Sequence, residues 1–171
     1  MKRDAVDHFL AQWHAEEPEV DVTPMGIVGR ISRMSRLLEA GIRPTFDAAG
    51  LQRSEFDLLA TLRRTGPPYR LSAGQLVTAM MVSPAAVTLR ADGLIAKGLV
   101  TRAVDPADRR SVLITLTPAG RRLVRQLLGK HVTRERELLA GLTDREVAQL
   151  AGLLRKALVG LGDTAPEDAQ P

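Results

Sequence analysis

The 171-residue sequence predicts a mainly α-helical fold with one small β-hairpin, from its helix-start signals and from a single stretch of period-two alternation. A start is marked by Ser or Thr before proline, or by Ser or Thr with Glu or Gln three residues later. Such starts lie at Thr23, Ser72, Ser83, Thr117 and Thr143. We therefore expect helices over 3–16, 24–49, 53–65, 72–81, 83–98, 117–140 and 143–161, and strands over 100–104 and 111–116.

The predicted hairpin, residues 99–116, combines two arms rich in β-branched residues with a turn. In the second arm Val112, Ile114 and Leu116 recur at every second position, so one face of that strand is apolar. Asp105 and the proline after it open the turn between the arms. The hairpin then runs directly into the next predicted helix.

Positive charge gathers around this hairpin. The chain has a formal net charge of +4, but residues 84–125 alone hold eight Lys and Arg against three Asp and Glu, a net of +5. Arg109 and Arg110 follow the turn and should project from its tip. An isolated pair of arginines in a turn usually serves only to keep the turn solvated. Beside a helix that reads DNA, the same two arginines can contact phosphates.

The helices expected over 72–81 and 83–98 are separated by little more than one residue, which is helix–turn–helix spacing. In the second helix Val87, Ala91 and Leu94 share one face, which should be buried. The residues expected to face a DNA major groove are Ser83, Ala85, Ala86, Thr88 and Leu89. A helical hairpin inside a bundle is the alternative, but the cationic hairpin that follows favours a winged helix–turn–helix domain over 51–116.

The remaining segments predict a dimer. Residues 1–22 should form an N-terminal extension helix, 23–50 and 117–162 a lobe of dimerisation helices, and 163–171 a mobile tail. The leucines of the last two helices exceed what a small winged helix can cover, so a second copy should cover them. Such a homodimer fits double-stranded DNA with a pseudo-palindromic operator, although packing within one chain is the alternative.

Composition excludes several classes of protein. The sequence has no cysteine and therefore no disulfide or thiolate zinc site. No apolar run approaches about 20 residues and no secretory leader is visible, so we expect a cytoplasmic protein without a membrane contact. No catalytic motif is present, so we expect no enzyme, no cofactor and no metal; a zinc site from His8, His131 and Glu16 or Glu17 is a weaker alternative.

Over roughly residues 24–160 the sequence resembles the MarR family of dimeric winged-helix regulators. The hairpin DPADRRSVLITLTPAG carries the most specific part of the resemblance, SPAAVTLRADGLIAKGLVTR is similar to the family's recognition helix, and LQRSEFDLLATL to its supporting helix. The resemblance implies a repressor that releases its operator when it binds a small anionic or phenolic molecule. A winged-helix module that binds protein rather than a DNA sequence is the alternative.

A narrower resemblance, to the urate-responsive branch, rests on DHFLAQWHAEEPEVD and the helix after it. It implies a site for a planar anion such as urate, formed by Trp13, Asp57, Arg90 and Arg102. Arg90 lies at the margin of the buried helix face and Asp57 in an apolar run, so the two could pair. Alternatives are a plain Asp57–Arg90 salt bridge with Trp13 in the core, and a different aromatic or carboxylate ligand.

Three positions depart from that branch. Leu89 and Gly93 replace a polar residue and an arginine, and Ile95 stands where an acidic residue is common. These changes predict altered or weaker base reading. Gly93 should also cost about 1 kcal/mol of helix stability relative to alanine at an exposed interior position.

Overall fold

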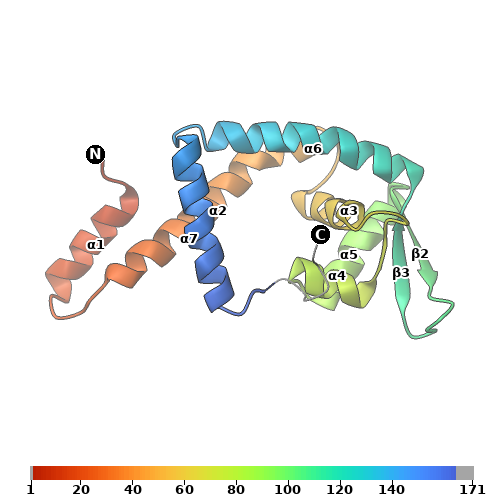
Figure 1. Cartoon of the computed structure of the whole chain (residues 1–171), viewed down its shortest axis with the longest axis horizontal. Coiled ribbons are helices and arrows are strands. Elements are labelled where there is room, and N and C mark those ends of the chain that lie inside the picture. Colours follow the sequence, from red (N-terminus) through yellow and green to blue (C-terminus); the bar gives the residue numbers. More distant parts are fainter. Residues whose placement is uncertain (1, 165–171) are drawn as a thin grey trace. The chain divides into compact units, whose positions relative to one another are not determined.

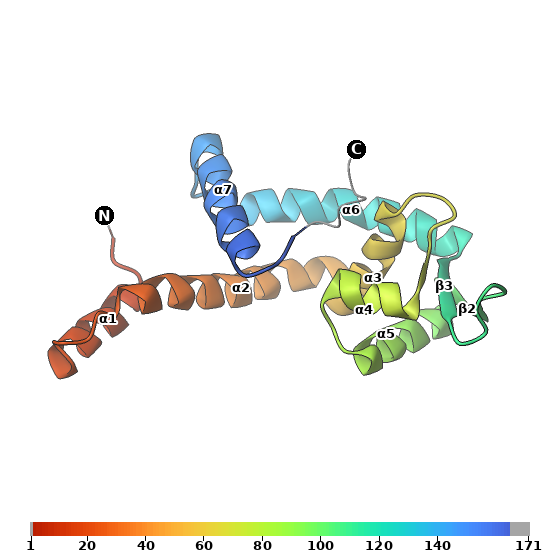
Figure 2. The same cartoon turned by 60° about the horizontal axis from the view of Figure 1, so that its bottom comes forward.

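The computed structural model describes residues 2–164 and shows a mainly α-helical chain with one small sheet, as predicted (Figures 1 and 2). It divides into two compact units, Met1–Arg134 and Glu135–Pro171. The elements are α1 (Ala5–Glu16), α2 (Thr23–Asp47), α3 (Arg53–Arg64), β1 (Arg70–Ser72), α4 (Ala73–Met80), α5 (Pro84–Ala96), β2 (Val100–Val104), β3 (Val112–Leu116), α6 (Pro118–Leu138) and α7 (Asp144–Gly160).

The sheet has three antiparallel strands in the order β1-β3-β2. In the predicted hairpin Arg102 lies opposite Ile114, and β1 adds Leu71 on the other side of Ile114. The prediction of only two strands was therefore wrong. β1 has just three residues and no visible alternation, so its pairing with β3 rather than its own sequence determines its conformation.

Helices α4 and α5 form a helix–turn–helix with a 110° bend between them. Ser72 and Ser83 cap the two helices by accepting hydrogen bonds from the backbone amides of Gln75 (3.1 Å) and Ala86 (3.2 Å), as predicted. Met81 closes α4 in the left-handed conformation with φ 52°. Among the described helices none is individually long and apolar enough to cross a membrane; α4 and α5 meet that criterion only jointly, as this bent pair.

The core of the first unit lies where α3 meets α2, α5 and the sheet. Phe46 of α2 stacks on Phe56 of α3 with ring centroids 4.5 Å apart, and both are buried. The predicted inner face of α5 is buried here, at Val87, Ala91 and Leu94. Gly120, in the first turn of α6, lies so close to the Leu99 carbonyl oxygen that a Cβ would overlap it. Glycine at this position thus lets α6 start directly behind β3.

The N-terminal helix packs along the first half of α2. Asp4 caps α1, and Arg30 of α2 donates to Asp4 (2.8 Å) and Asp7 (2.6 Å). The start of α2 differs from the prediction that Thr23 is its N-cap. Val22 occupies that position without a side-chain hydrogen bond, and Asp21 instead accepts a hydrogen bond from the Thr23 amide (3.0 Å).

The second unit holds the end of α6 and all of α7. Thr143 caps α7 in a capping box with Glu146, as predicted. No residue of α7 is buried in this single chain, and Leu153, Leu158 and Val159 are exposed. The predicted mobile tail, 163–171, lies outside the described residues from 165 onward.

Candidate functional site

The outer face of α5 carries the residues predicted to read DNA. Ser83, Ala85, Thr88 and Leu89 are exposed and Ala86 is half-buried, while the opposite face of the helix packs on the core. Ala85, Thr88 and Leu89 share one stripe because they are three and four residues apart. The side chains on this stripe are small or apolar, so a DNA groove can approach the helix closely.

The tip of the β2–β3 hairpin presents two cations. Asp105 accepts a hydrogen bond from the Ala107 amide (2.9 Å) and Asp108 accepts one from the Arg110 amide (3.0 Å). These bonds hold the backbone of the turn, while the side chains of Arg109 and Arg110 are exposed. The hairpin therefore has the form of a wing that can reach phosphates.

The surplus of positive charge extends from the wing into the helix that follows it, within the segment 84–125 that the sequence singled out. Three of the eight basic residues of 84–125, Arg121, Arg122 and Arg125, lie on α6. Arg121 stacks over the Tyr69 ring at 5.5 Å, and Arg63 stacks over the same ring at 4.7 Å. Part of the +5 therefore belongs to a cluster at the base of the sheet, away from the hairpin tip.

Asp57 lies half-buried on α3, which packs against α5. Burial raises the pKa of its carboxyl, while Arg53, Arg90 and His131 act on that pKa in the opposite direction. Its ion-pair partner is Arg53, one turn earlier on α3, at 4.0 Å. Arg90 of α5 is thus an electrostatic neighbour of Asp57, but the expected pair is replaced by a pair within α3.

Arg102 is linked to α5 through an acidic residue of that helix. It lies on β2, and its Nη2 is 2.8 Å from Oδ1 of Asp92 on α5. Both side chains are partly exposed, so the pair contributes little to stability but does link strand and helix. Two of the predicted ligand residues are therefore connected to α5: Arg90 belongs to this helix, and Arg102 forms an ion pair with it.

Within the described residues of a single chain, Trp13 lies far from the other predicted ligand residues. It is exposed on α1, whose Leu10 lies against Gly26 of α2. Asp57, in contrast, is an electrostatic neighbour of Glu39, thirteen residues further along α2. At 1.5 Å per residue this separation is roughly 20 Å. One protomer alone therefore does not bring the tryptophan to the carboxylate.

An ion pair with a buried carboxylate, which the sequence did not predict, joins α3 to the end of α5. The Glu55 side chain is 8% exposed, and Lys97 donates to both of its carboxylate oxygens at 2.7 and 2.6 Å. Glu55 also accepts from the Gln52 amide (2.8 Å) as part of the capping box of α3. Nothing in the sequence singled out Glu55, whose lysine partner lies 42 residues further along the chain.

Gly93 lies against this ion pair, which corrects the view of it as an exposed helix position. It is half-buried, and a Cβ on it would lie 2.7 Å from Oε1 of Glu55. The glycine therefore leaves room for the carboxylate. An arginine here would require Glu55 to move.

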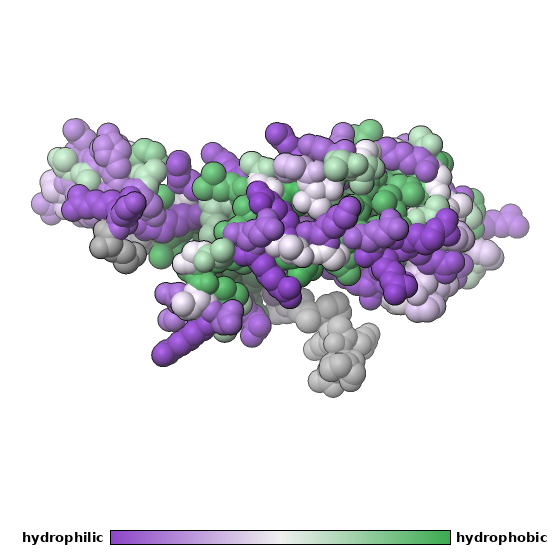
Figure 3. All heavy atoms as spheres, turned by 90° about the horizontal axis from the view of Figure 1, so that it is seen from above, coloured by the Kyte–Doolittle hydropathy of each residue, from purple (hydrophilic) through white to green (hydrophobic). Residues whose placement is uncertain are grey.

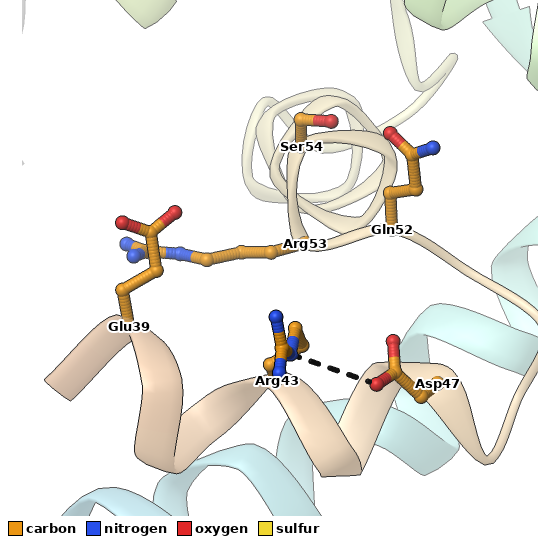
Figure 4. A pocket seen from close by; sticks show the side chains of 6 residues that line it. All are labelled: Glu39, Arg43, Asp47, Gln52, Arg53 and Ser54. Carbon is orange, nitrogen blue, oxygen red and sulfur yellow. Dashed lines mark ion pairs between the residues drawn. The ribbon is translucent and has the colours of Figure 1, made fainter. Parts of the chain in front are cut away.

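A cavity of about 260 Å³ opens between α2 and the start of α3 (Figure 4). It is lined by Glu39, Arg43, Asp47, Gln52, Arg53 and Ser54. Arg43 pairs loosely with Asp47 at 3.9 Å, and Arg53 extends across the opening toward Glu39 (Figure 4). Two basic and two acidic side chains balance each other, so this cavity by itself does not select an anion.

Within residues 2–164 no group of three His, Asp or Glu side chains could hold a metal ion.

Comparisons with known proteins agree with this architecture. A family model described as MarR family matches residues 49–111. The transcriptional regulator PecS of Dickeya dadantii is 39% identical over 149 residues, which cover 87% of this chain and 90% of PecS.

Two solved structures are similar over most of the chain. One is an Escherichia coli MarR variant in complex with operator DNA, with a TM-score of 0.69, 28% identity, and coverage of 80% of this chain and 95% of that one. The other is Bordetella bronchiseptica BpsR, whose DNA binding is described as regulated by 6-hydroxynicotinic acid, with a TM-score of 0.70, 29% identity, and coverage of 81% and 94%. The winged helix–turn–helix, the match of its sequence to the family model and the extended likeness to PecS together show that the chain belongs to the MarR family of DNA-binding transcriptional regulators.

Proposed function

We propose that this protein is a repressor that binds a pseudo-palindromic operator as a homodimer and releases it on binding a small planar anion such as urate. The observation that carries the ligand part is that Asp57 on α3 lies near enough to Arg90 on α5 for the charge of this arginine to act on its carboxyl. A carboxylate whose pKa is raised by burial, beside an arginine of the DNA-reading element, is a site where a second anion changes the balance of charge.

Operator binding uses the exposed face of α5 and the tip of the wing. The face that enters the major groove is formed by Ser83, Ala85, Ala86, Thr88 and Leu89. Arg109 and Arg110 contact phosphates of the flanking groove, which fixes the register of the protein without reading sequence. The relation to a protein solved with operator DNA supports this role over that of a protein-binding module.

The apolar surface of the N-terminal helices supports a homodimer. Side chains of α1 and α2 that would ordinarily be covered are exposed in the single chain, namely Phe9, Trp13, Met25, Ile27, Val28, Ile31 and Leu37. Figure 3 shows hydrophobic side chains uncovered among hydrophilic ones on the face it draws. A second copy is the simplest cover for such a surface, and it would set two recognition helices about one DNA turn apart.

Ligand binding is coupled to DNA binding because both arginines of the proposed ligand site are connected to α5. Arg90 belongs to this helix, and Arg102 pairs with Asp92 on the same helix. An anion that draws both guanidinium groups toward Asp57 weakens the Arg102–Asp92 pair and displaces the reading surface. The affinity for the operator then falls by the same factor by which the operator lowers the affinity for the ligand.

The tryptophan of this site comes from the second copy. Trp13 lies roughly 20 Å along α2 from the residues around Asp57, so a shared site requires α1 of the partner. An indole stacked on a planar ligand contributes apolar contact that neither arginine supplies. The regulation of BpsR by a hydroxylated pyridine carboxylate supports a planar anion as the ligand class, with an aromatic carboxylate as the alternative to urate.

The experiment is a titration of the operator-bound protein with urate, 6-hydroxynicotinate and aromatic acids, read by DNA-binding anisotropy and by the fluorescence of the single tryptophan. We expect one ligand class to quench the fluorescence and release the DNA together. Unchanged fluorescence and unchanged DNA binding across the panel would remove the ligand proposal and leave the DNA-binding role intact.

Mixed dimers test whether the site is shared between copies. We expect Trp13→Phe and Arg102→Ala homodimers each to respond weakly, and a dimer with one subunit of each type to regain one intact site of two. If both residues belong to the same protomer, the mixed dimer gains nothing over the homodimers.

A further inference from the structure

The helix–turn–helix carries the two most exposed large hydrophobic side chains of residues 2–134. These are Met81, which is 80% exposed, and Leu89, which is 76% exposed. Single apolar residues on a surface need no special explanation. Only their position in the fold can therefore indicate whether these two have a function. Met81 directly follows α4 as its C-cap, whereas Leu89 lies within the exposed stripe of α5.

The stripe around Leu89 offers few groups that read bases by hydrogen bonds. Arginine and lysine recognise guanine in the major groove, and asparagine and glutamine recognise adenine. The thirteen residues of α5 contain one of these four types, Arg90, which is half-buried beside Asp57. Asp92, at the end of the stripe, is paired with Arg102 at 2.8 Å. Apolar side chains and the hydroxyl of Thr88 therefore form the centre of the reading surface.

The apolar group that DNA presents in the major groove is the C5-methyl of thymine. From the exposure of Leu89 on this stripe we infer that Leu89 reads one thymine methyl in each half-site, so that the operator requires an A·T pair there. Ala85, one turn before Leu89 on the same stripe, allows the helix to approach that base closely. The inference rests on the DNA-binding role and adds the base class that the recognition helix selects.

Deoxyuridine tests this contact directly because it retains the pairing edge of thymine and lacks only the methyl group. A duplex selected by the full-length protein from a random pool is resynthesised with each thymine replaced singly by deoxyuridine. We expect one replacement per half-site to weaken binding about fourfold, the equivalent of losing one buried methyl group. Thymines that Leu89 does not touch show no effect.

The protein side of the test uses Leu89→Ala and a matched control, Met81→Ala. In Leu89→Ala the same deoxyuridine replacement should change the affinity by less than about 1.5-fold, because the methyl no longer has a partner. Met81→Ala should keep the full response. If Leu89→Ala binds too weakly to measure, Leu89→Met replaces it and should retain sensitivity to the methyl group.

The possible failures can be told apart. Binding to no duplex at all would overturn the DNA-binding role. Selective binding in which no thymine is sensitive to deoxyuridine, or in which the sensitivity persists in Leu89→Ala, overturns the inference about Leu89. Unaltered operator binding by Leu89→Ala overturns it as well and assigns the exposed leucine to a contact with another protein.

Discussion

Replacing Lys97 with methionine removes the partner of a buried carboxylate while keeping most of the side-chain volume. In the native protein the Lys97 ammonium lies 2.6 and 2.7 Å from the two oxygens of Glu55, whose side chain is 8% exposed. The variant leaves that carboxylate buried with one remaining donor, the Gln52 amide. The pair also joins α3 to the C-terminal end of the recognition helix, so its removal should loosen that end.

The size of the effect follows from the burial of the two partners. Breaking a fully buried pair by removing one partner costs about 3–5 kcal/mol. The Lys97 side chain is 38% exposed, so water reaches the site, and we expect a smaller loss of about 2 kcal/mol. For a chain of this length that loss lowers the melting temperature by about 4–8 °C.

Thermal unfolding followed by circular dichroism measures this loss, with the exposed Lys130→Met on α6 as the matched control. Adding Glu55→Gln to Lys97→Met should restore part of the stability, because the double variant no longer buries an unpaired charge. The reasoning is refuted if Lys97→Met shifts the melting temperature no more than Lys130→Met, or if the second substitution deepens the loss.

The remaining predictions concern four other positions. Gly93→Ala should destabilise the protein, although alanine has the higher helix propensity by about 1 kcal/mol, because its Cβ would meet Oε1 of Glu55 at 2.7 Å; urea unfolding measures the sign. Asp57→Asn should raise the melting temperature at pH 7, because burial raises the pKa of this carboxyl and its charged form costs stability. The gain should shrink as the pH falls through that raised pKa and vanish below the ordinary pKa of an aspartate, where the carboxyl is protonated in both the native and the unfolded chain. Arg109→Ala should reduce the steepness of log affinity against log salt by about one for each phosphate that the arginine neutralises, equally for all sequences, whereas Thr88→Ala should change the preference among sequences.

Local signals in the sequence were sufficient to predict the helices and the division of α5 into a buried and an exposed face. Ser83 before proline, together with the spacing of Val87, Ala91 and Leu94, defined both the start of α5 and its buried face, and the structure confirms each. Capping depends on neighbours within three residues, and burial of a helix face depends on its period. Both are properties that one short stretch of sequence contains.

Features that depend on distant partners were not predictable in this way. Strand β1 forms because β3, about 40 residues later, offers it an edge. Glu55 was not singled out in the sequence, because its partner Lys97 lies 42 residues away. Gly93 resembled a weak point in a helix until the structure placed Glu55 beside it. The expected ion pair between Asp57 and Arg90 does not form, for a related reason. Arg53, four residues before Asp57 on the same helix, pairs with this carboxylate instead.

The contacts of α5 are distributed so that a ligand would act unequally on its two ends. At the C-terminal end, Lys97 is fixed to the buried Glu55, and nothing in the proposed ligand site competes for that carboxylate. Near its middle, the helix is linked through Arg90 beside Asp57 and through the partly exposed pair of Asp92 with Arg102. An anion competes with both of these weaker links. The helix would then turn about its fixed end, and the displacement would be largest in the half that presents the reading stripe to DNA.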